Sequence, residues 1–131
     1  MATTAIDDLR EELGWILELP GVEAVLLFGS RASGTSDASS DIDICVVAPQ
    51  ITDRRGQSEL LGRLWQRLDP RRYDVWLFEE LPLYMKMSVI TSHVVIACRD
   101  VPALFEYFYR FRKIWKDQAH RQACLLYTSD A

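Results

Sequence analysis

The chain lacks the features that mark a membrane, secreted or disulfide-stabilised protein. It has three cysteines, an odd number without CxxC spacing, which argues against a disulfide framework or a zinc site. No apolar run approaches the roughly 18 residues that a membrane span requires. The first residues have neither the positive start nor the apolar stretch of a signal peptide. We therefore expect a cytoplasmic protein.

An excess of positive charge is also missing. Fifteen Lys and Arg residues stand against 19 Asp and Glu, a net charge of −4, which argues against a dedicated nucleic-acid-binding domain. The remaining composition, 49% hydrophobic and 26% charged, is typical of a globular domain. We expect residues 1–118 to form one domain, and we assign residues 119–131 as a C-terminal tail, disordered or non-native, because they fit no element.

Apolar runs alternate along the chain with segments of helical periodicity. Such alternation predicts an α/β domain whose sheet is largely covered by helices. Pro20-Gly21 ends the first predicted helix, and Asp100 is placed to cap the last one. Strands are predicted at about residues 22–28, 42–47, 73–78 and 93–98, and helices at about residues 4–19, 53–68, 83–90 and 100–118.

Two carboxylates lie on one face of the second predicted strand. Side chains alternate along a strand, so Asp41 and Asp43 point to the same side. Asp74, in the third predicted strand, would add a third carboxylate if that strand were adjacent. Such carboxylates repel one another unless a cation lies between them, and oxygen ligands suit Mg²⁺ or Mn²⁺. Three acids could hold two metal ions for an in-line displacement at phosphorus, with Asp74 near the attacking hydroxyl.

A turn of small residues precedes these acids. Gly29 allows the backbone to approach a phosphate closely, and Ser30 supplies a hydroxyl where a short helix could begin. Arg31 is a candidate phosphate ligand, although solvation or pairing with an acid is equally open, and Ser40 is a weaker candidate. The conjunction of this turn with the carboxylates indicates binding of a nucleotide and a metal together.

The pattern Gly29-Ser30, Asp41-Ile42-Asp43-Ile44 and Asp74 resembles the DNA polymerase beta-like nucleotidyltransferase superfamily, and in detail its minimal nucleotidyltransferase (MNT) group. The resemblance implies a palm-like fold, a mixed sheet flanked by helices. It implies Asp41, Asp43 and Asp74 as metal ligands and catalytic residues, and Gly29 and Ser30 as the triphosphate turn. Ser33 departs from the pattern, since a basic residue is usual there.

The resemblance also implies a reaction. An acceptor attacks the α-phosphorus of ATP or another NTP, with Mg²⁺ bound and pyrophosphate released. MNT proteins often act as antitoxins that transfer AMP to a hydroxyl of a helical HEPN partner. Two alternatives stay open: an antitoxin or binding module that neutralises its partner by contact, and a nucleotidyltransferase acting on a small molecule, as aminoglycoside-modifying relatives do. Nucleic acid is the less expected acceptor.

Two further surfaces and two histidines carry less specific signals. The segment 102–118 bears large apolar side chains on more than one face, which suits a core helix alone or a core helix that also binds a partner or a second copy. Arginines gather around the third predicted helix, and a solvated face is favoured over a binding patch. His93 and His120 are expected to be structural or surface residues. The arginines are Arg54, Arg55, Arg63, Arg67, Arg71 and Arg72.

Overall fold

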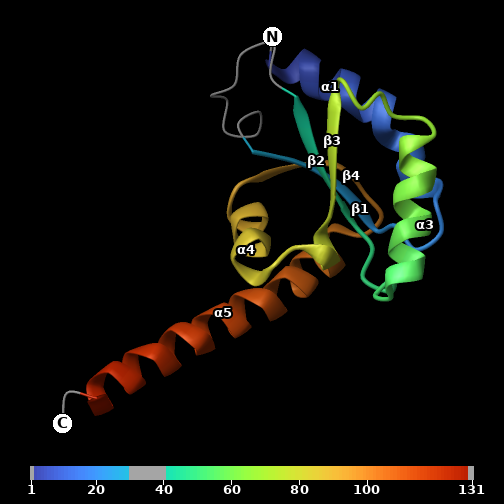
Figure 1. Cartoon of the computed structure of the whole chain (residues 1–131). Coiled ribbons are helices and arrows are strands. Elements are labelled where there is room, and N and C mark those ends of the chain that lie inside the picture. The colour runs from blue at the N-terminus through green and yellow to red at the C-terminus, as the bar shows by residue number, and fades with distance from the viewer. Residues whose placement is uncertain (1, 30–40, 130–131) are drawn as a thin grey trace.

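A mixed four-stranded sheet forms the centre of the protein (Figure 1). The computed structural model describes residues 2–29 and 41–129, and the side chains of residues 5–29 and 41–124. The strand order is β3-β2-β1-β4, in which β1 pairs antiparallel with β2 and β4, and β2 pairs parallel with β3. The strands are β1 (Ala24–Phe28), β2 (Ile42–Val47), β3 (Tyr73–Leu77) and β4 (His93–Cys98).

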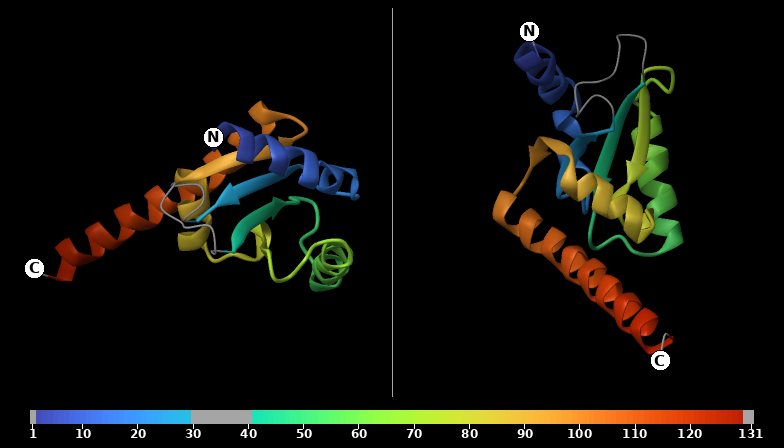
Figure 2. Two further views of the ribbon diagram at one scale, coloured as in Figure 1. Left: turned by 90° about the horizontal axis from the view of Figure 1, so that it is seen from above. Right: turned by 90° about the vertical axis from the view of Figure 1, so that its left-hand side faces the viewer.

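Helices cover both faces of the sheet, as the two turned views show (Figure 2). On one face lie α1 (Ala2–Leu13), the 3₁₀ helix η1 (Gly14–Glu18) and α3 (Arg54–Trp65). On the other lie α4 (Leu83–Thr91) and the first part of α5 (Val101–Ser129), and the short 3₁₀ helix η2 (Phe78–Glu80) follows β3. This architecture confirms the predicted α/β fold with a mixed sheet flanked by helices.

The apolar strands divide their side chains between two cores. In β2, Ile44 and Val46 face the core shared with α1 and α3, whereas Cys45 and Val47 face the core shared with α4 and α5. A sheet covered on both sides must be apolar on both sides, which explains the nearly continuous apolar runs in the sequence. Phe78 is fully buried in the second core and packs against Phe108 of α5, with ring centroids 5.3 Å apart.

Helix ends differ most from the prediction. The first helix changes at Gly14 from α to 3₁₀ geometry, and the chain then turns at Gly21, whose φ is +85°. The last helix begins as predicted, because Oδ1 of Asp100 accepts a hydrogen bond from the N–H of Ala103 at 3.2 Å. It does not end near Gln118 but continues to Ser129, so that expected boundary was wrong. Nothing in the intrinsic preferences of Ala, Gln and Arg beyond Gln118 would stop a helix.

Among the described residues, no helix is long and apolar enough to cross a membrane. The longest, α5, carries charged residues along its length.

Candidate active site

Two of the predicted carboxylates lie side by side on neighbouring strands. Asp43 of β2 is the register partner of Asp74 in β3, and it also lies opposite Phe28 of β1. Register partners point to the same face of a sheet, so both carboxylates lie on the side that α4 and α5 cover further along the strands. Both are partly buried, whereas Asp41, just before β2, is exposed. The parallel pairing of β2 with β3 thus creates the acidic pair that the sequence predicted.

The turn after β1 approaches this pair directly. Gly29 has φ +77°, in the left-handed region that side chains disfavour. A Cβ atom at this position would lie 2.6 Å from Oδ2 of Asp43, closer than van der Waals contact permits. Glycine is therefore required here both by the backbone conformation and by the neighbouring carboxylate. The predicted phosphate turn and the predicted metal ligand are in contact at this point.

The electrostatics of the pair centre on Asp43. Burial raises the pKa of its carboxyl, and repulsion from Asp74 and Asp41 raises this pKa further. The indole of Trp76 acts in the opposite direction by favouring the charged carboxylate. Among the described residues the buried Nε1 of Trp76 has no hydrogen-bond partner at normal geometry, so its effect on Asp43 is that of a nearby N–H rather than of a well-formed bond. Phe28 packs edge-on against Trp76, with centroids 6.4 Å apart.

The donor set suits a divalent cation, although it does not form a complete metal site. Within the described residues, no group of three His, Cys, Asp or Glu side chains is close enough to hold a metal ion. Asp43 and Asp74 nevertheless repel each other across adjacent strands, and a cation between them would relieve this repulsion. Oxygen-only ligation of this kind fits Mg²⁺. Asp41, Asp43 and Asp74 stay predicted as the metal ligands.

Three predicted nucleotide-binding residues, Ser30, Arg31 and Ser40, lie outside the described residues, as does Ser33. Gly29 is the described member of that predicted set. Sequence reasoning missed Trp76. The alternation of side chains along a strand could have identified it, because Trp76 follows Asp74 by two residues and so shares its face of β3.

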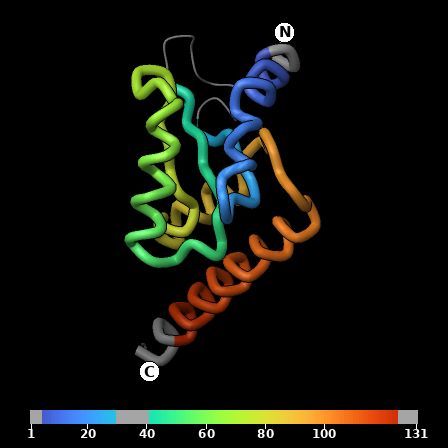
Figure 3. Tube along the Cα trace, turned by 90° about the vertical axis from the view of Figure 1, so that its right-hand side faces the viewer, coloured from blue at the N-terminus to red at the C-terminus, as the bar shows by residue number. Residues whose placement is uncertain are grey.

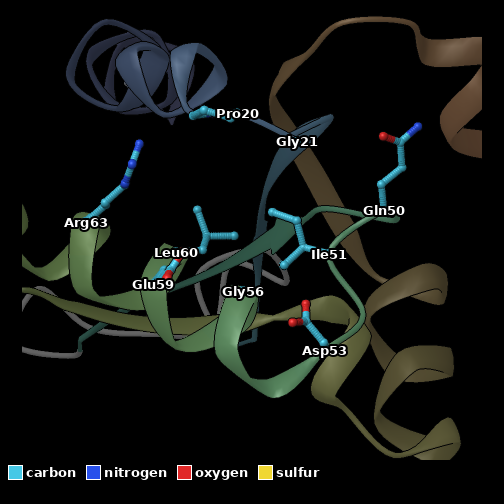
Figure 4. A pocket seen from close by; sticks show the side chains of 9 residues that line it. All are labelled: Pro20, Gly21, Gln50, Ile51, Asp53, Gly56, Glu59, Leu60 and Arg63. Atoms are coloured by element: carbon cyan, nitrogen blue, oxygen red, sulfur yellow. The ribbon is translucent and has the colours of Figure 1, made fainter.

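One pocket of the protein lies apart from the acidic pair. A pocket of about 390 Å³ lies where residues before β1 meet residues after β2, at the opposite end of these strands from Asp43 (Figure 4).

Several arginines of the basic tract make separate contacts: Arg72 pairs with Glu12 at 2.8 Å, and Arg67 lies over the ring of Trp15 at 4.0 Å. His93 donates through Nδ1 to the carbonyl of Val89 at 2.8 Å, at the end of α4.

Comparison with known proteins agrees with this geometry. The sequence profile of the family described as Polymerase beta, Nucleotidyltransferase matches residues 15–101. A protein of Methanocaldococcus jannaschii, named as a proposed protein adenylyltransferase, is 46% identical over 100 residues, which are 76% of this chain and 75% of that protein. The fold and these matches define a nucleotidyltransferase, the enzyme class that the sequence predicted. The chain belongs to the polymerase beta nucleotidyltransferase family.

Solved structures extend the comparison to the MNT group. The crystal structure of a toxin–antitoxin with AMP-PNP contains a chain that is 26% identical to this one, with a TM-score of 0.64 and coverage of 88% of this chain and 94% of that one. A chain in the complex of tri-AMPylated Shewanella oneidensis HEPN toxin with MNT antitoxin shares the fold at 21% identity, with a TM-score of 0.63 and coverage of 95% and 96%. The resemblance to MNT proteins is thereby confirmed.

Proposed function

We propose that this protein is a Mg²⁺-dependent enzyme that transfers AMP from ATP to a hydroxyl group of a protein partner, as the antitoxin of a HEPN/MNT-type pair. The observation that carries the proposal is the contact of the Gly29 turn with Asp43, which itself lies in register with Asp74. Nucleotidyl transfer needs a triphosphate turn and metal-binding carboxylates at one place. The names of the similar proteins support adenylyl transfer and a toxin–antitoxin setting.

Each residue of the candidate active site has a proposed role. Asp41, Asp43 and Asp74 would hold Mg²⁺, and the bound ion would supply charge neutralisation at the phosphates and orientation of the reacting oxygens. Asp74, on the outer strand of the pair, would also accept the proton of the attacking hydroxyl. Gly29 gives the nucleotide phosphates access to backbone N–H groups, and Ser30, Arg31 and Ser40 are assigned to the same phosphates from the sequence. We place this ATP-dependent activity in the cytoplasm.

A label-transfer experiment tests the proposal. The purified complex of this protein with its HEPN-like partner is incubated with Mg²⁺ and ATP labelled at the α-phosphate, and label is sought on each protein chain. Wild type should label the partner, and both Asp43→Asn and addition of EDTA should abolish labelling. Asp8→Asn, an exposed carboxylate on α1, is the matched control and should label normally. Each of the other labelled NTPs is run in parallel.

The outcomes separate this proposal from its alternatives. A folded complex that transfers no label from any nucleotide would contradict the enzyme proposal and favour neutralisation by contact. Labelling of a small molecule in the absence of any partner would favour the small-molecule alternative. Asp43→Asn should still form the complex, because the carboxylate is placed in the catalytic site and not in the partner surface.

A further inference from the structure

The distal part of α5 leaves the body of the protein. From residue 112 to residue 124 every side chain is exposed, and the helix extends away from the sheet in all views (Figures 1, 2 and 3). Isolated helices of this length are marginal in water, and most helices in proteins are stabilised by packing of one face. The distal segment therefore has the form of a helix whose packing partner is another molecule.

The apolar face of α5 continues onto this segment. Near the body, Phe108 and Phe111 pack against Phe78, with centroid distances of 5.3 and 5.4 Å. Seven residues after Phe108 comes Trp115, and three after Phe111 comes Ile114, spacings that keep the same side of a helix. Trp115 is 44% exposed and Ile114 is 45% exposed. The apolar stripe of α5 that packs in the second core thus continues along the helix beyond the point where the body of the protein covers it.

Positive charge flanks this stripe on both sides. By helical periodicity Arg112 and Lys116 border Trp115, and Arg121 borders Ile114 on the other flank. Residues 110–124 contain five basic residues and one acidic residue, a net charge of +4 in a chain whose total is −4. We call Ile114 and Trp115, with their flanking Arg112, Lys116 and Arg121, the distal face of α5.

A second copy of this chain is a poor partner for the distal face. Of the large apolar side chains that the described residues expose, five lie on α5 itself, and the other two are Trp65 and Tyr84. Outside α5, the surface formed by the described residues thus offers no apolar stripe to cover Trp115 and Ile114. Pairing α5 with α5 of another copy would bring two segments of like charge together, which is unfavourable.

We propose that the distal face of α5 binds a helix of a different protein, one with an apolar stripe flanked by acidic residues. The proposal rests on the proposed function in one respect, because we identify that protein with the one that supplies the acceptor hydroxyl. The geometry is compatible with this role: α5 and the Asp43–Asp74 pair belong to the same side of the sheet.

Site-specific crosslinking followed by a binding measurement tests the proposal. The photoreactive residue p-benzoylphenylalanine replaces Trp115 in the full chain, or Trp65 as the control on α3, and adducts formed in cells are identified by mass spectrometry. We expect an adduct from position 115, mapped to a helix rich in acidic residues in another protein, and none from position 65. That protein is then purified and titrated against the variants by calorimetry.

The affinities give the decisive result. Trp115→Ala should weaken binding by about 30-fold or more, the effect expected of a buried aromatic anchor. Lys116→Glu should slow association and reduce its salt dependence, because acidic residues oppose it. Trp65→Ala should bind as wild type does. All variants should keep the thermal stability of wild type, since the substituted side chains are exposed.

Three results would overturn the proposal: an adduct only with a second copy of this chain, no adduct from position 115, or unchanged affinity in Trp115→Ala. Its failure is distinguishable from failure of the proposed function. If the identified protein binds through α5 but receives no AMP from the wild-type enzyme, the docking surface stands and the proposed acceptor is wrong. If AMP transfer proceeds equally with Trp115→Ala, the catalytic proposal stands and the docking surface is wrong.

Discussion

The phenol of Tyr107 on α5 donates a hydrogen bond to Oε2 of Glu79 at 2.9 Å, and Oε1 of the same carboxylate accepts one from the N–H of Ala48, also at 2.9 Å. Glu79 therefore joins the end of β2 to the helix that carries the proposed docking surface. Lys86 adds to this junction by donating to the carbonyls of Glu79 and Leu81, while its ammonium lies 5.6 Å from the ring of Phe78. Polar contacts as well as aromatic packing fix the direction of α5.

Removal of the Tyr107 hydroxyl should loosen this junction. Tyr107→Phe keeps the ring packing but leaves one oxygen of the partly buried Glu79 without its donor, so we expect a loss of about 1–3 kcal/mol in the free energy of unfolding. Urea denaturation measures the change. Tyr109→Phe, two residues further on and 65% exposed, is the matched control and should stay within about 0.5 kcal/mol of wild type. Equal stability of the two variants would contradict the assigned role of Glu79.

The same carboxylate should make stability depend on pH. Burial raises the pKa of Glu79 above its ordinary 4.5, although the hydrogen bonds from Ala48 and Tyr107 partly oppose this shift. The folded protein thus binds this proton more tightly than the unfolded chain, so the contribution of Glu79 to stability is greatest below pH 4.5 and is lost as pH rises through the folded-state pKa. Glu79→Gln cannot titrate, and its amide can still pair with both partners.

Over that window, wild type should therefore lose stability relative to Glu79→Gln as pH increases. Urea denaturation of both proteins between pH 4 and pH 8 gives the difference directly. A difference that stays constant across this range would show that the Glu79 carboxyl does not titrate with a raised pKa.

The sequence was sufficient to predict the strands and the carboxylate face for a simple physical reason. A sheet buried on both sides requires long apolar runs, so polar residues inside them, such as Asp43 and Asp74, are conspicuous. The alternation of side chains then gives their common face. The parallel pairing of β2 with β3 brings Asp43 and Asp74 together. This pairing depends on contacts between segments that are distant in the sequence, so no local sequence pattern shows it.

Other features depended on contacts that have no local signal. Glu79 looks like an ordinary acidic residue after a strand, and only the packing of η2 against α5 shows that Tyr107 and Ala48 satisfy its carboxylate. The predicted end of α5 near Gln118 is too early, because the run of large apolar residues that marks this helix in the sequence stops at Trp115. The part of α5 that extends beyond the body does not pack in the protein core, so helix formation there does not require an apolar pattern.

Substitution of two of the three predicted catalytic carboxylates, Asp43 and Asp41, should separate activity from stability. Asp43→Asn removes a partly buried charge that Asp74 and Asp41 repel, so we expect it to raise the free energy of unfolding by roughly 0.2–1 kcal/mol. The rate of nucleotidyl transfer should fall by about 100-fold or more. Asp41→Asn should lower activity equally but leave stability within about 0.5 kcal/mol, because Asp41 is exposed.

Activity assays with labelled ATP and urea denaturation of the same preparations measure both quantities. The expected pattern is opposite to that of most damaging substitutions, in which activity and stability fall together. Retention of full activity in Asp43→Asn would exclude this carboxylate from catalysis. A loss of stability in that variant would instead show that Asp43 is held by a favourable contact.

Gly29→Ala should affect both the fold and the reaction, since the new methyl group meets two obstacles. The backbone at φ +77° costs a residue with a Cβ about 1–2 kcal/mol, and that Cβ would lie 2.6 Å from Oδ2 of Asp43. Gly62→Ala on α3 is the matched control, because its Cβ meets nothing within 4 Å, and it should stabilise the helix by roughly 0.5–1 kcal/mol. Urea denaturation should move the two variants in opposite directions, and transfer activity should fall in Gly29→Ala alone. A stable but inactive Gly29→Ala would mean that the carboxylate moves away from the methyl group, whereas a stable and fully active one would show that the close approach of the turn to Asp43 is not needed for nucleotide transfer.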